Sequence, residues 1–144
     1  MIPAGTNQGR KGIMPQKMTA EQFFSGLFAA LAAKGWRGIA TRDEVFQRAV
    51  ASTFQRLVEQ AGDRGIDLRF RIYLDPVHMD SPTIWDSISK TAQRDLISLA
   101  NPEFVDIEIK LSNWGAQSVL GTLPGGAGLF RELADYFVTQ YETH

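Results

Sequence analysis

The stretch at residues 66–74 reads IDLRFRIYL, and apolar and polar residues alternate along most of it. Isoleucine, leucine and phenylalanine occupy every second position, while Arg69 and Arg71 lie between them. This period of two predicts a strand with one apolar face. Residues 105–111 read VDIEIKL and show the same alternation. These two stretches predict the sheet of the protein.

A helix is expected between the two strands. Its apolar stripe follows helical spacing at Trp85, Ile88, Ala92, Leu96 and Leu99. Pro82 suits the first turn of this helix, where its missing N–H costs nothing, and the Asn101-Pro102 pair would end it. The unit is therefore strand–helix–strand, and direct pairing of its strands would make them parallel with a right-handed crossover.

The polar positions of the two strands carry opposite charges. Arg69 and Arg71 lie on the first strand, and Asp106 and Glu108 lie on the second. Because opposite charges on neighbouring strands attract, we expect these side chains to share one face of one sheet.

Capping boxes mark the starts of two helices that precede the sheet. Thr19 with Gln22, and Thr41 with Glu44, have the spacing of this motif. An apolar stripe at helical spacing follows each of them. A short helix is expected at residues 113–123, and a last helix after the proline- and glycine-rich break that comes next.

The expected fold class is α+β. We expect one mixed α/β domain over residues 19–144, with a small sheet of two or three strands around the central strand–helix–strand unit. About four to five helices would cover one face of this sheet. Because two strands make a thin sheet, a third is expected from around Ile39, from the Met14 region or from another copy of the chain. Residues 1–18 are polar and glycine-rich, which predicts a flexible basic leader.

The composition argues against several classes of function. The sequence contains no cysteine, so disulfides, thiolate metal sites and cysteine nucleophiles are excluded. This fits a reducing compartment, and we expect a cytoplasmic location. No apolar run is long enough to span a membrane, so no membrane partner is expected. Three of the 15 basic residues and none of the 16 acidic ones lie in the leader, so the rest of the chain is acidic. That balance argues against nucleic acid as a partner.

One loop carries residues that are suited to chemistry. Asp75, His78 and Asp80 follow the first predicted strand and precede a predicted helix, where α/β proteins often bind ligands. A histidine between two carboxylates can act as a general base or as a metal ligand. The alternative interpretation is a turn at Asp75-Pro76 and a helix cap at Asp80 or Ser81.

A second candidate is the tripeptide Glu108-Ile109-Lys110 on the second strand. Together with Asp75, it resembles the core of the PD-(D/E)xK nucleases. The resemblance implies that Asp75 and Glu108 hold Mg²⁺ near a phosphate, while Lys110 positions or activates water. Those nucleases usually carry the two motif elements on adjacent antiparallel strands, whereas here a helix separates them. The alternative is that Glu108 and Lys110 are the outward residues of a half-buried strand.

The sequence contains no complete catalytic constellation, so the leading hypothesis is a non-catalytic protein-interaction module. Such a small bacterial accessory, adaptor or regulatory protein would dock to another protein or to a second copy of itself. Trp36 and Arg37 lie in a connection and are the interface candidates, because tryptophan and arginine are favoured at interfaces. No metal or other cofactor is expected. The first alternative is a metal-dependent hydrolase or nuclease using Asp75, His78, Asp80, Glu108 and Lys110.

A weaker alternative is a DNA-binding protein. The first two predicted helices are joined by a five-residue connection, which is near the length of the turn in a helix-turn-helix motif. The acidic body and the mixed charges of the second helix count against it.

Overall fold

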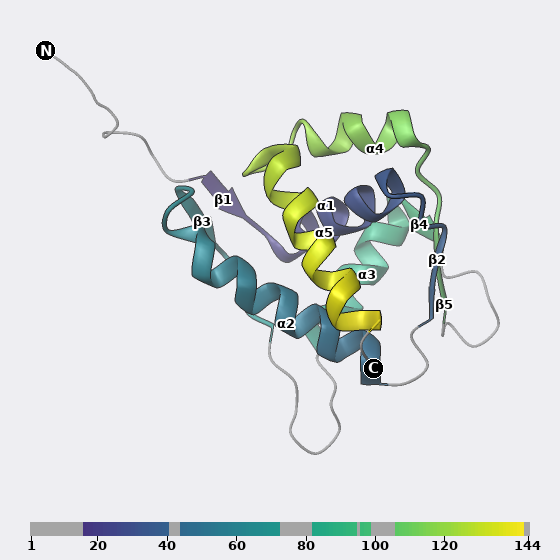
Figure 1. The fold of residues 1–144 in the computed structure, drawn as a ribbon, viewed down its shortest axis with the longest axis horizontal. Helices are drawn as coiled ribbons and strands as arrows, with labels where there is room; N and C mark the ends of the chain where they lie inside the picture. The colour runs from purple at the N-terminus through teal and green to yellow at the C-terminus, as the bar shows by residue number, and fades with distance from the viewer. Residues whose placement is uncertain (1–15, 41–43, 73–81, 95, 99–105, 143–144) are drawn as a thin grey trace, which may run out of the picture.

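The computed structural model describes residues 16–40, 44–72, 82–94, 96–98 and 106–142 (Figure 1). This part of the chain contains five helices, a two-stranded sheet and a three-stranded sheet. The expected α+β class is therefore confirmed. The expected single sheet is not found, since the strands are divided between two small sheets.

Helix α1 (Ala20–Ala33) is the centre of the fold. It begins with the predicted capping box, in which the Gln22 backbone N–H donates to the Thr19 hydroxyl and the Thr19 N–H donates to the Gln22 side chain. It ends where Gly35 takes a φ of 96°, a left-handed conformation that favours glycine. Residues 23–32 are buried without interruption, because α1 packs against α3, α4 and α5. A helix buried on all sides needs no polar face, which explains its almost wholly apolar sequence.

Four further helices complete the fold, and three of them, α3, α4 and α5, pack directly on α1. The four are α2 (Glu44–Ala61), α3 (Pro82–Gln93), α4 (Asn113–Leu120) and α5 (Gly126–Glu142). Helices α2 and α5 pack against each other, and α4 crosses the opposite side of α1 (Figure 1). The predicted start of α2 at Thr41 lies outside the described residues.

Helix α3 is shorter than predicted. It ends at Gln93, and Ile97–Ser98 forms strand β4 instead of a further helical turn. The expected stripe through Leu96 is therefore wrong, and Leu99 lies outside the described residues. Ile97 is buried and aligned with Ile109 of the neighbouring strand, so tertiary pairing outweighs the helical spacing here.

The two predicted strands lie in different sheets. Strand β3 (Ile66–Leu68) pairs in parallel with β1 (Gln16–Met18). Strand β5 (Asp106–Ile109) lies between β2 (Gly38–Ala40) and β4, antiparallel to both. Since β5 already has a neighbour on each side, it has no free edge for β3.

The expected charge pairing across one sheet is accordingly wrong. Arg69 and Arg71 follow β3, whereas Asp106 and Glu108 belong to β5 in the other sheet. Arg69 instead pairs with Asp67 two residues earlier, at 3.1 Å.

Both places expected to supply an additional strand within the chain contribute one. Ile39 lies in β2, opposite Ile107, and residues 16–18 next to the Met14 region form β1. The last three residues of the predicted leader therefore belong to a sheet, and Met18 is fully buried. The flexibility expected for residues 1–15 stays a prediction, because those residues lie outside the described part of the chain.

Candidate functional site

The predicted catalytic residues are not brought together in the described part of the chain. Asp75, His78 and Asp80 lie outside it. Glu108 is exposed on β5, aligned with Gly38 of β2 and Ser98 of β4, and Lys110 is exposed just beyond the strand. Within the residues that the structure describes, no group of three histidine or acidic side chains could hold a metal ion. The described positions therefore form no site that supports the hydrolase hypothesis.

Trp36 and Arg37, the predicted interface residues, make contacts within the protein. The Trp36 ring is half-buried and packs edge-on against Tyr141 of α5, with ring centroids 5.9 Å apart. The exposed Arg37 guanidinium donates to the backbone carbonyls of Trp36 and Leu111, each at 3.1 Å. These contacts hold the start of β2 against α5 and against the end of β5. Each residue thus has a structural role, and the interface role stays a prediction.

The first two helices do not follow one another through a tight turn. Strand β2 lies between α1 and α2 and pairs with β5, so the connection is part of a sheet. Helix α1 is also buried on all sides. This arrangement differs from the packed, exposed helix pair that a helix-turn-helix motif requires.

Trp114 is an exposed tryptophan. It is 82% exposed, on the outer side of α4, whereas Ala116 and Leu120 of the same helix are buried. Tryptophan is highly buried on average, so the exposure of Trp114 is unusual. The spacing of Ala116 and Leu120, four residues apart, marks the inner face of α4, and Trp114 lies away from that face. The spacing of Ala116 and Leu120 can be read from the sequence, but the bounds of α4 are needed to conclude from it that Trp114 lies on the outer face.

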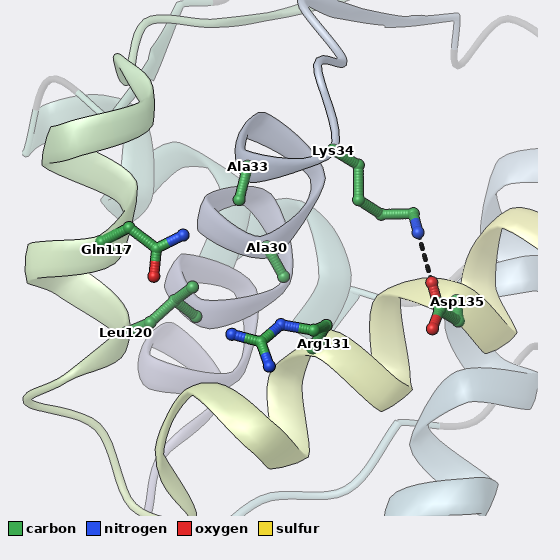
Figure 2. A pocket seen from close by; sticks show the side chains of 7 residues that line it. All are labelled: Ala30, Ala33, Lys34, Gln117, Leu120, Arg131 and Asp135. Atoms are coloured by element: carbon green, nitrogen blue, oxygen red, sulfur yellow. Dashed lines mark hydrogen bonds and ion pairs between the residues drawn. The ribbon is translucent and has the colours of Figure 1, made fainter.

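A hollow lies where α1, α4 and α5 meet (Figure 2). It has a volume of about 220 Å³, an apolar floor and a polar rim. On the rim, Lys34 and Asp135 form an ion pair between α1 and α5. Arg131 points into the hollow and has no hydrogen-bond or ion-pair partner among the described residues. The lining consists of Ala30, Ala33, Lys34, Gln117, Leu120, Arg131 and Asp135.

Trp114 and this hollow form one surface. Gln117, which lines the hollow, comes one helical turn after Trp114, and side chains three residues apart on a helix lie about 5–6 Å from each other. Tryptophan and arginine are both enriched among the residues that dominate binding at protein interfaces. We call Trp114, Gln117, Arg131 and the hollow the α4 surface.

A second depression lies between α2 and the chain that continues from β3. Its volume is about 380 Å³, and it is lined by Phe54, Val58, Leu68, Arg69, Phe70 and Arg71. We call it the α2–β3 groove. Val58 is 44% exposed, and Val58 and Trp114 are the exposed large apolar side chains of the described residues. Val58 lies in the α2–β3 groove, and Trp114 lies on the α4 surface.

Comparisons with protein-family models, with curated protein sequences and with solved structures found no match for this chain. Among the helices that the structure describes, none has both the length and the apolar character needed to cross a membrane. The case for a function therefore rests on the two surfaces themselves.

Proposed function

We propose that this protein is a non-catalytic protein-interaction module, a small accessory, adaptor or regulatory protein of a bacterial type. The observation that carries the proposal is the exposure of Trp114 on α4. A tryptophan that is 82% exposed leaves a large apolar area in water, and burial against a partner would remove that area from solvent.

The neighbouring residues support a docking role for the α4 surface. Arg131 is exposed and has no partner within the described chain, so its guanidinium is available to a carboxylate or carbonyl of another protein. The hollow offers space for a side chain of that protein, and burial of such an anchor supplies much of the affinity in many interfaces. The occupant is another protein or a second copy of this chain, in a cytoplasmic setting that suits a chain without cysteine.

Site-specific photo-crosslinking combined with direct binding measurements tests this proposal. A photoreactive phenylalanine analogue in place of Trp114, in the full chain in its native cells, should form a discrete cross-linked product that mass spectrometry identifies. The purified partner should then bind the wild-type protein, and Trp114→Ala should weaken binding on the order of 10- to 100-fold, as expected for a tryptophan at an interface centre.

A control variant and a measurement of the oligomeric state make this test specific. Ser118→Ala changes an exposed side chain one turn further along α4 and should leave the affinity unchanged. Sedimentation velocity of wild type and Trp114→Ala over a range of concentrations identifies a second copy as the partner, if there is one. A dissociation constant that is the same for wild type and Trp114→Ala, or no discrete product from position 114, would overturn the proposal.

A further inference from the structure

The α2–β3 groove has an apolar floor that is built from both of its sides. Phe54 of α2 and Phe70 of the opposite segment pack together with ring centroids 5.1 Å apart, and both contact Phe23 of α1. Above this aromatic cluster, Val58 is 44% exposed, and Leu68 and Phe70 are half-buried. The groove therefore presents apolar side chains to solvent on a rigid base.

The segment after β3 continues without a partner strand. Arg69 donates its backbone N–H to the Met18 carbonyl at 2.9 Å, which is the last backbone hydrogen bond of this sheet. For Phe70, Arg71 and Ile72, no backbone hydrogen bond is found with any part of the chain that the structure describes. Ile72 is only 2% exposed, so its backbone groups are enclosed, but the N–H and C=O groups of Phe70 and Arg71 are open to pairing with an added strand, a common mode of peptide recognition.

The charge at the groove selects the kind of segment that fits. Arg71 is exposed, and its guanidinium has no ion-pair partner in the described residues. Within the described ranges, Arg69 pairs only with Asp67, at 3.1 Å, and both side chains remain about half exposed, so water weakens that pair. Two arginines against one carboxylate leave the rim of the groove positive, which attracts acidic groups and repels basic ones.

We propose that the α2–β3 groove binds an extended acidic segment of another protein, in which apolar residues alternate with aspartate or glutamate. The apolar side chains fill the groove over Phe54 and Phe70, the carboxylates pair with Arg69 and Arg71, and the backbone adds to that of Phe70 and Arg71. The leader of this chain, with Arg10, Lys11 and Lys17, is basic like the rim, so its charge does not suit this groove. This site is separate from the α4 surface, so the present proposal can be tested independently of the function proposed above.

Peptide probes of defined sequence test the proposal with the full-length protein. A fluorescein-labelled decapeptide that alternates glutamate with leucine should bind saturably in an anisotropy titration, and the same peptide with lysine for glutamate should not. Binding should weaken as salt is raised, because the arginines and carboxylates are partly screened. Backbone amide exchange at Phe70 and Arg71 should slow when the acidic peptide is bound, because an added strand protects these groups.

Matched variants separate groove binding from general charge attraction. Arg71→Glu should weaken the acidic peptide about tenfold or more, because it replaces attraction by repulsion at the rim. Arg131→Glu makes the same change at an arginine of the α4 surface and should leave the affinity unchanged. Val58→Asp should also weaken binding, because it places a carboxylate in the apolar part of the groove.

Several results would overturn the proposal. These are equal affinity for the acidic and lysine peptides, no saturable binding of the acidic peptide, or equal effects of Arg71→Glu and Arg131→Glu. Protection of the Phe70 and Arg71 amides in the protein without peptide would show that another part of this chain already occupies the groove, which would also overturn it.

Discussion

Gly26→Ala should destabilise the protein, although the same change within a helix normally stabilises it. Alanine is favoured over glycine in a helix interior by about 1 kcal/mol. At position 26 of α1, however, an added Cβ would lie 2.5 Å from Cδ1 and 2.6 Å from Cζ of Phe130, and closer still to Cε1. The Phe130 ring is fully buried, so it cannot move away into solvent.

The steric cost exceeds the gain in helix propensity. An extra methyl group in a well-packed core typically costs about 1–3 kcal/mol, and contacts with three ring atoms favour the upper end of that range. After subtraction of the propensity gain, Gly26→Ala should lower the free energy of unfolding by about 2 kcal/mol. In a chain of this length, that corresponds to a fall in Tm of roughly 6–8 °C.

Urea denaturation and calorimetry of four variants check this reasoning. Gly128→Ala is the matched control, because a Cβ at this position of α5 meets nothing within 4 Å. It should be neutral or stabilise the protein by up to about 1 kcal/mol. Phe130→Leu removes the ring, so Gly26→Ala should cost less in the Phe130→Leu background than in the wild type. An increase in stability with Gly26→Ala, similar to that of Gly128→Ala, would refute the close packing of α1 against α5.

Three further changes address other parts of the fold. Phe28→Ala, at a fully buried position of α1, should lower the free energy of unfolding by roughly 3–5 kcal/mol, and a near-neutral result in urea would contradict the buried centre of α1. Thr19→Ala should cost about 1 kcal/mol, because it removes one half of the capping box, whereas Thr19→Ser should retain most of that stability. Deletion of residues 1–15 should leave Tm nearly unchanged, and a fall of several degrees by calorimetry would show that those residues pack against the domain.

Local patterns in the sequence predicted the elements better than their partners. The capping box at Thr19 predicted the start of the first helix correctly, because it depends only on residues within the first turn of the helix. The alternation around Leu68 and around Ile107 indicated two strands, although β3 is shorter than its pattern. Such signals are readable because they involve neighbours along the chain.

The candidate chemistry was harder to place from sequence. Glu108 is exposed on β5, as the alternative to a nuclease site expected, and Lys110 is exposed just beyond the strand, but the predicted neighbours of Glu108, Arg69 and Arg71, belong to another part of the fold. Trp36 and Trp114 have the same side chain, yet one packs against Tyr141 and the other is 82% exposed. Composition carries no information on which of them finds a neighbour.

The sequence by itself determined the α+β class, the capped start of α1 and the apolar face of β5. Only the tertiary structure decided that β3 pairs with β1 while β5 pairs with β2 and β4. The physical reason is that a strand edge offers the same N–H and C=O groups to any partner, so pairing depends on which distant segments the packing of helices brings together. The same packing left Val58 and Trp114 exposed, and with them the two surfaces on which the proposals depend.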